Sequence, residues 1–199
     1  MRLNPEATFD CLFLADRLQQ ESGTFSAPEI HLFGYLACLL WLYRRRPVTD
    51  WGYSFVGTEL GAPFSLDIDQ TVKALVERGH CARVQERLRM SEFAEQSLRE
   101  LNSLVLNQER AECLHAACAS TAAFSPGMVG TALGQEPELR RARAVPMSRP
   151  LLEVSARQQL YVQFDALHHS LGQERGDLRV PAVVWLAALY RSSEPVQRR

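Results

Sequence analysis

The first hydrophobic pattern on the chain repeats at helical spacing between Asn4 and Gly23. Asn4 followed by Pro5 is typical of a helix cap and first turn, and Ser22-Gly23 is typical of a helix stop. The apolar residues between these signals lie on one face of a helix, at Phe9, Leu12, Phe13 and the stretch 15–18. The pattern therefore predicts an amphipathic first helix.

A second helix follows, and its pattern is different. Ser26 stands three residues before Glu29, with Pro28 between them, which matches a capping box. Residues 30–43 are apolar on nearly every face, which predicts a deeply buried helix. Three arginines and Pro47 then end it, with positive charge at the negative end of the helix dipole.

The next segment contains glycines and aromatic residues, then a helical pattern and an alternating one. Residues 48–64 suit a loop or a short extended segment, and Ser65 is positioned to cap a third helix that stops at Gly79. Residues 81–90 alternate partly at period two, as a short hairpin does, and Ser91 restarts a helix. The apolar positions of the third helix are Ile68, Val72, Leu75 and Val76.

Helix, helix, helix, hairpin, helix is the element order of a winged helix-turn-helix domain. We therefore predict a mainly α fold, in which a winged helix-turn-helix domain with a short β-hairpin wing precedes a helical C-terminal region. The helix after the hairpin is expected to be long, since its period continues toward an alanine-rich stretch. The predicted parts are a winged-helix domain with this trailing helix at 1–123, a linker or short helices at 124–150, C-terminal helices at 151–192 and a frayed tail at 193–199.

Composition narrows the functional classes without choosing one. The chain has 199 residues, of which 46% are hydrophobic and 23% charged, as in an average soluble domain. The net charge of −1 provides no global attraction to nucleic acid or anionic lipid. No apolar run reaches the roughly 18 residues needed to span a bilayer, and the N-terminus lacks a signal-peptide pattern. We expect a cytoplasmic protein that does not contact a membrane.

Catalytic and cofactor motifs are missing from the sequence. The glycines form no dinucleotide or phosphate-binding motif, and no serine lies in a nucleophile elbow. The five cysteines are scattered, and the neighbouring His168 and His169 point about 100° apart on a helix, so neither set suggests a metal site. We therefore expect no enzyme activity, no cofactor, no metal and no small-molecule substrate.

Two groups of residues are candidates for contacts with macromolecules. The third helix carries three acids against Lys73 and Arg78, which disfavours direct DNA reading by that helix. Arginines after the second helix and on the predicted wing are candidate contacts to a nucleic-acid backbone, or else a solvated basic rim: Arg44, Arg45, Arg46, Arg83, Arg87 and Arg89. Aromatic residues are candidates for a protein interface, or else a core cluster: Trp41, Trp51, Tyr53, Phe55 and Phe64.

Four stretches carry a resemblance to a known family. They are Phe-Gly-Tyr-Leu-Ala-Cys-Leu-Leu-Trp-Leu-Tyr, Gly-Tyr-Ser-Phe-Val, Gly-Ala-Pro-Phe-Ser-Leu-Asp-Ile-Asp and Leu-Val-Glu-Arg-Gly-His, at 33–43, 52–56, 61–69 and 75–80. Over residues 5–100 the chain resembles the middle component of bacterial ABC three-component defence systems, which include the Lamassu small subunit. The segment from Gly52 to Ser65 is also similar, with Ala62 in place of a glycine, to Panacea or SocA-like antitoxins.

The first resemblance implies a non-enzymatic winged-helix subunit. Such a subunit attaches to an SMC-like ATPase, in a complex whose effector, often a nuclease, is held inactive until foreign DNA is sensed. The subunit would then contact DNA only as part of the assembled complex. Two alternatives stay open: a DNA-binding winged-helix transcriptional regulator, and an antitoxin that neutralises a neighbouring toxin.

Overall fold

The computed structural model describes residues 3–144, 148–172 and 177–193, and in these residues the fold is mainly helical, as predicted. The α-helices are α1 (Pro5–Ser22), α2 (Ala27–Tyr43), α3 (Leu66–Glu77), α4 (Glu92–Asn102), α5 (Val105–Ala119), α6 (Pro126–Leu133), α7 (Pro137–Arg143), α8 (Val154–Leu171) and α9 (Arg179–Ser193). Short 3-10 helices are η1 (Val48–Trp51) and η2 (Ser120–Ala122). The strands are β1 (Val56–Gly57), β2 (Pro63–Phe64), β3 (Cys81–Val84), β4 (Arg87–Met90) and β5 (Arg149–Pro150).

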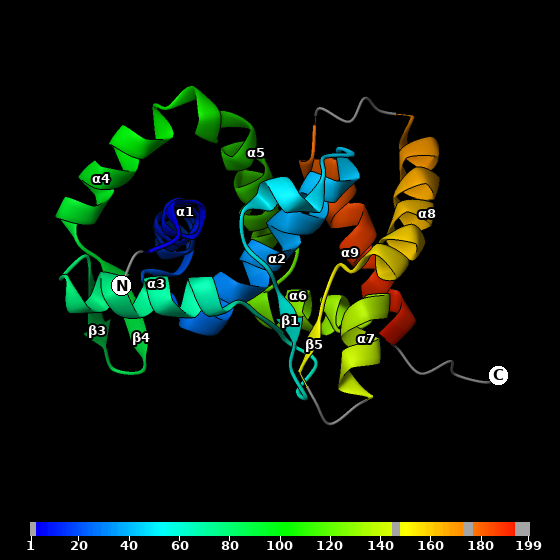
Figure 1. The fold of residues 1–199 in the computed structure, drawn as a ribbon, viewed down its shortest axis with the longest axis horizontal. Coiled ribbons are helices and arrows are strands. Elements are labelled where there is room, and N and C mark those ends of the chain that lie inside the picture. The colour runs from blue at the N-terminus through cyan, green and yellow to red at the C-terminus, as the bar shows by residue number, and fades with distance from the viewer. Residues whose placement is uncertain (1–2, 145–147, 173–176, 194–199) are drawn as a thin grey trace.

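Helix α2 is the centre of the molecule. It packs against α1, α3 and α5 from the first half of the chain and against α6 and α8 from the second. Figure 1 shows α2 in the middle, with α1, α3 and α4 to one side and α8 and α9 to the other. Because both halves of the chain cover the same apolar helix, their buried residues form one continuous core. No helix in the described part of the chain is both long enough and apolar enough to cross a bilayer.

The predicted caps of the first two helices are confirmed. The side chain of Asn4 accepts a hydrogen bond from the Ala7 N–H, and Ser26 and Glu29 form the reciprocal capping box. Ser65 differs from expectation: it precedes α3, but its hydroxyl makes no capping hydrogen bond. Its backbone N–H instead donates to Nδ1 of His31 at 3.1 Å. The Ser65 hydroxyl is buried and has no hydrogen-bond partner among the described residues, so the contact with His31 joins the start of α3 to α2 through the backbone without capping the helix.

The hairpin is also confirmed, and it is joined to the connection between α1 and α2. Strands β3 and β4 pair antiparallel, with Cys81 opposite Met90 and Val84 opposite Arg87. Phe25 forms a further antiparallel bridge with Leu88, through hydrogen bonds of 2.9 and 2.7 Å. The hairpin is therefore held against the body of the molecule.

The long trailing helix expected after the hairpin is divided in two. The chain turns at Ser103 and Leu104, where Leu104 is extended, and Nδ2 of Asn107 donates to the Leu101 carbonyl at 2.8 Å. The physical reason is packing: α4 covers α1, whereas α5 lies along both α1 and α2. A straight helix could not reach both surfaces, so the chain bends between them (Figure 1).

Residues 124–150 contain short helices that belong to the core, so in the described residues of this range they do not form a linker. Val129 and Leu133 of α6 and Leu139 of α7 are buried completely. Strand β5 pairs with β1, which makes a small antiparallel sheet in the order β2-β1-β5. The predicted C-terminal helices are present as α8 and α9. The predicted frayed tail lies outside the described residues, apart from Ser193.

Candidate functional site: an apolar groove beside α2

An open apolar groove lies where the first turns of α2 and α6 meet the turn between β1 and β2. Its volume is about 520 Å³, and we call it the α2–α6 groove. Most of the lining is apolar, with Leu32 on α2, Leu60, Pro63 and Phe64 around the turn, and Pro126 and Gly130 on α6. The polar side chains of the lining are Glu29, His31 and Thr58. The chain thus builds the groove from three separate segments.

The β1–β2 turn presents Leu60 rigidly on the rim of the groove. The Thr58 N–H and hydroxyl both donate to the Ala62 carbonyl, at 2.9 and 3.0 Å, and the Gly61 N–H donates to the Thr58 carbonyl at 2.8 Å. Gly61 has φ +72°, a conformation that favours glycine. The Leu60 side chain is 87% exposed. A large aliphatic side chain on such an ordered turn is a surface feature that a partner can cover.

His31 is the most buried polar residue in the lining of the groove. Its side chain is 6% exposed, its ring stacks on Phe64 with centroids 4.8 Å apart, and its Nδ1 accepts the Ser65 N–H. Burial lowers the pKa of His31 to about 4, against a smaller opposing effect of Asp69. The imidazole is therefore neutral at pH 7, and the hydrogen bond at Nδ1 leaves its proton on Nε2. Nε2 makes no hydrogen bond within the described residues, and it is not among their fully buried unpartnered atoms, so it stays accessible to solvent.

The three consecutive arginines after α2 are each ion-paired within the chain. Arg44 contacts Glu112 at 2.6 Å, and Arg46 contacts Glu109 at 2.7 Å. Arg45 pairs with Asp165, and its guanidinium lies 4.4 Å from the ring centre of Tyr161. These contacts join the end of α2 to α5 and α8. They neutralise much of the local positive charge that a nucleic-acid backbone would meet.

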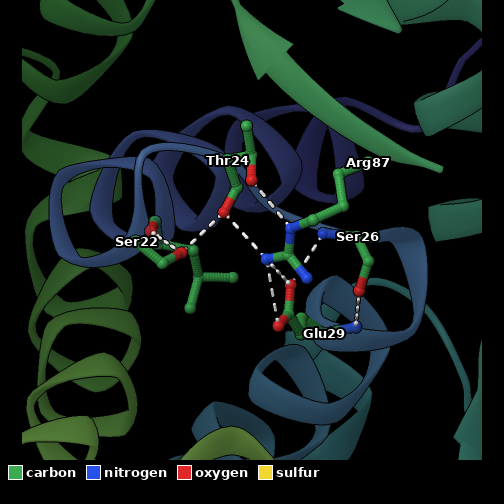
Figure 2. A network of polar contacts seen from close by, with 6 residues as sticks. Ser22, Thr24, Ser26, Glu29 and Arg87 are labelled. Atoms are coloured by element: carbon green, nitrogen blue, oxygen red, sulfur yellow. Dashed lines mark hydrogen bonds and ion pairs between the residues drawn. The ribbon is translucent and has the colours of Figure 1, made fainter. Parts of the chain in front are cut away.

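Arg87 on the hairpin is also engaged within the chain. Figure 2 shows its guanidinium between the α1–α2 connection and the start of α2. Nε donates to the Thr24 hydroxyl at 2.7 Å, and Nη2 donates to the Thr24 carbonyl at 2.8 Å and to Glu29 at 2.9 Å. The same Glu29 carboxylate completes the capping box by accepting the Ser26 N–H at 2.7 Å. Arg87 therefore anchors the hairpin to the first turn of α2.

The last two candidate arginines are exposed but do not face the same way. In the hairpin register, Arg83 is opposite Leu88 and Arg89 is opposite Ala82, so the two arginines lie on opposite faces of the two-stranded sheet. Neither forms an ion pair with another residue in the described part of the chain. The structure therefore does not bring the six candidate arginines together into one basic surface.

Most of the candidate interface aromatics belong to the core. Trp51 is buried completely, and Phe55 and Tyr53 are nearly so, which makes these three unavailable to a partner in this conformation. Trp41 is partly exposed, and its Nε1 donates to the Pro47 carbonyl at 2.9 Å. Of the five aromatics, only Phe64 lines the α2–α6 groove.

The aromatic cluster surrounds a buried ion pair. Arg110 on α5 contacts both carboxylate oxygens of Asp10 on α1, at 2.5 and 2.7 Å, and its guanidinium lies 3.8 Å from the ring centre of Trp51. The Tyr53 hydroxyl donates to the same carboxylate at 2.6 Å. The partners satisfy one another inside the core, so the cluster joins α1, α5 and the segment after η1.

Sequence reasoning did not identify His31 or Leu60 as site residues. The signal for Leu60 was present, because an isolated leucine between Glu59 and Gly61 in a turn has no core-facing pattern. No comparable signal existed for His31, whose neighbours in the groove come from distant segments.

The remaining candidates for chemistry are metal-ligating side chains and thiols. Within the described ranges, no three His, Cys, Asp or Glu side chains are placed to hold a metal ion. All five cysteines are buried, and burial raises the pKa of the Cys81 thiol to about 11.

Comparisons of this chain with protein-family models, with curated proteins and with solved structures find no match.

Proposed function

We propose that this chain is a non-catalytic, cytoplasmic accessory subunit of a bacterial antiphage complex, which docks on an SMC-like ATPase and helps to hold an effector nuclease in check. The observation that carries the proposal is the α2–α6 groove with Leu60 on its rim. Two of the four segments that carry the family resemblance adjoin or line this groove, at 33–43 and 61–69. An exposed apolar surface of this kind is typical of a protein-binding site.

The chemistry of the groove supports binding over reaction. His31 is its buried titratable group, and Nδ1 of that residue is occupied by the Ser65 N–H. With a pKa of about 4, the imidazole is a weak base at neutral pH. The other polar side chains of the lining are already bonded: Glu29 accepts from Arg87 and from the Ser26 N–H, and the Thr58 hydroxyl donates to the Ala62 carbonyl. Hydrophobic burial is therefore the main source of free energy for any occupant.

We further propose that α1, α2, α3, the hairpin and α4 constitute a winged helix. The bridge between Phe25 and Leu88, which joins the hairpin to the α1–α2 connection, supports this interpretation. The connection from α2 to α3 covers 44–65, far longer than the short turn of a DNA-reading helix-turn-helix. This departure supports a role in protein binding for the domain.

The proposed mechanism is a shift of conformational populations. A subunit that binds one state of a complex more tightly stabilises that state by the difference in binding free energy. If the groove is covered only in the resting state, docking keeps the effector inactive. Release of the groove then accompanies activation.

Leu60→Asp provides the direct test, because the residue is exposed and its replacement leaves the core intact. The chain is co-expressed with the products of its adjacent genes and purified through a tag on this chain. We expect a stable complex with a long SMC-like ATPase, which Leu60→Asp abolishes. The matched control is Leu106→Asp, which should leave the complex intact, since Leu106 is 78% exposed on α5 and does not line the groove. Purification of the wild-type chain alone, as a monomer, would contradict the proposal.

The same experiment separates the two alternatives. A transcriptional regulator would shift its own promoter fragment in a gel, with an affinity that falls as salt rises. The internal pairing of Arg44, Arg46 and Arg87 leads us to expect no such shift. An antitoxin would bind a small neighbouring protein whose expression alone stops growth.

A further inference from the structure

We propose that the occupant of the α2–α6 groove is an amphipathic helix of the partner, which places an apolar stripe against Leu32, Leu60 and Phe64 and one hydrogen-bond acceptor against Nε2 of His31. This inference rests on the proposed docking function and specifies what the partner presents. It is carried by the apolar lining of the groove, the chemistry of its sheet edge and the unpartnered N–H of His31.

The sheet edge beside the groove disfavours an extended peptide. In the order β2-β1-β5, both sides of β1 are already paired, so β2 is the strand next to the groove that has an open edge. Pro63 occupies β2 and has no N–H to donate to an added strand. A helix satisfies its own backbone hydrogen bonds and needs none from the groove. The open, apolar walls then match the side-chain stripe of a helix.

The imidazole N–H makes the groove selective among apolar helices. Nε2 of His31 carries a proton at neutral pH, makes no hydrogen bond within the described residues and is not among their fully buried unpartnered atoms, so a partner that covers the groove must also cover this donor. A purely apolar stripe would cover this N–H and leave it unsatisfied, which costs binding free energy. A helix with Ser, Thr, Asn, Gln, Asp or Glu facing His31 would satisfy it. The groove therefore selects one acceptor within an apolar stripe.

The probe is a display library of random peptides of about 16 residues, long enough to form a helix in water. Selection uses the wild-type chain, and counter-selection uses Leu60→Asp. We expect enriched peptides to carry apolar residues at spacings of three and four, with one acceptor residue within that stripe. Enrichment of peptides with an alternating apolar pattern would contradict a helical occupant. Enrichment of apolar stripes without an acceptor residue would contradict a hydrogen bond from His31.

Two His31 variants divide the two roles of the imidazole. His31→Asn keeps an acceptor near the Ser65 N–H but removes the donor that reaches the groove. His31→Gln extends an amide N–H toward the groove. For the best enriched peptide, we expect His31→Asn to weaken binding about fivefold and His31→Gln to retain most of the affinity. Equal affinity for wild type and His31→Asn would overturn the hydrogen bond.

A peptide-side test needs no variant of the protein. Replacing the acceptor residue by an apolar residue of similar shape should weaken binding to the wild-type chain by a similar factor, and should have no effect on His31→Asn. A proline in the middle of the peptide should abolish binding, whereas a proline at its first position should be tolerated. Binding that survives the central proline would show an extended occupant.

Failure of this inference is distinguishable from failure of the docking function. If Leu60→Asp breaks the complex but the selected peptides are not helical, docking stands and the helix is wrong. If helical peptides bind but Leu60→Asp leaves the complex with the ATPase intact, the groove is not the docking site. A wild-type chain that self-associates, with dissociation by Leu60→Asp but not by Leu106→Asp in sedimentation equilibrium, would identify a second copy as the occupant and overturn the inference.

Discussion

Single buried polar residues define much of this molecule's chemistry, and each is explained by its immediate neighbours. Glu136 is fully buried at the start of α7, where its carboxylate accepts hydrogen bonds from the backbone N–H groups of Glu138 and Leu139, each at 3.0 Å. The Tyr35 hydroxyl donates to the same carboxylate at 3.2 Å. Burial nevertheless raises the pKa of Glu136 to about 7. The residue therefore titrates near neutrality inside the core.

This titration predicts a pH dependence of stability. The unfolded chain loses the Glu136 proton near pH 4.5, whereas the folded chain holds it to about pH 7. Between those values the folded state binds more protons, so the free energy of unfolding falls as pH rises, and it levels off above pH 7. We expect wild type to lose about 3 kcal/mol relative to Glu136→Gln across this window. Urea unfolding of both proteins at pH 5 and pH 8 measures the difference, and a pH-independent difference would contradict it.

At the scale of elements, the hairpin shows how one side chain fixes the placement of two strands. Arg87 reaches from β4 to Thr24 and Glu29, beside the backbone bridge between Phe25 and Leu88 (Figure 2). Arg89, two residues later on the same strand, is exposed. Strand alternation places Arg87 and Arg89 on the same face of the hairpin. Only Arg87 lies close enough to the α1–α2 connection to form hydrogen bonds with it.

The two arginines therefore form a matched pair for mutation. Arg87→Ala should lower the free energy of unfolding by about 1 kcal/mol, since the contacts are multiple but the side chain is partly exposed. It should also speed hydrogen exchange at the Leu88 amide, which donates to Phe25. Arg89→Ala should change stability by less than about 0.5 kcal/mol. Equal effects of the two substitutions would show that the Arg87 contacts add nothing.

For the whole molecule, the shared use of α2 is the organising feature. Helices from both halves of the chain cover it, and α5 packs against both α2 and α9. The buried residues of the proposed winged helix and of the C-terminal helices consequently belong to one core. The boundary predicted from sequence, between a winged-helix domain and the C-terminal helices, therefore does not separate two hydrophobic cores.

A single core predicts a single unfolding transition. Thermal unfolding followed by near-ultraviolet and far-ultraviolet circular dichroism should give coincident curves, and calorimetry should give equal van't Hoff and calorimetric enthalpies. The reason is that loss of α6–α9 would expose the apolar surface of α2 and α5, so neither half keeps its stability alone. Two resolved transitions would show that the halves fold independently.

The amino-acid sequence by itself determined the local features of this protein. Asn4, the Ser26–Glu29 capping box and the turn at Gln85-Glu86 are set by interactions between residues close in the chain, so helix limits and the hairpin could be predicted. Ser65 is the exception: it begins α3 as its residue type predicts, but its hydroxyl makes no capping hydrogen bond, and its backbone N–H donates to His31 of a distant segment.

Only the tertiary structure decided which residues meet across the chain. The pairing of Asp10 with Arg110, the burial of Trp51 and the bend at Leu104 depend on how helices share α2, and no local pattern records that packing. The α2–α6 groove is of the same kind, since His31, Leu60 and Gly130 reach it from three separate segments. Local free energies select the elements, whereas burial of apolar area around α2 selects their arrangement.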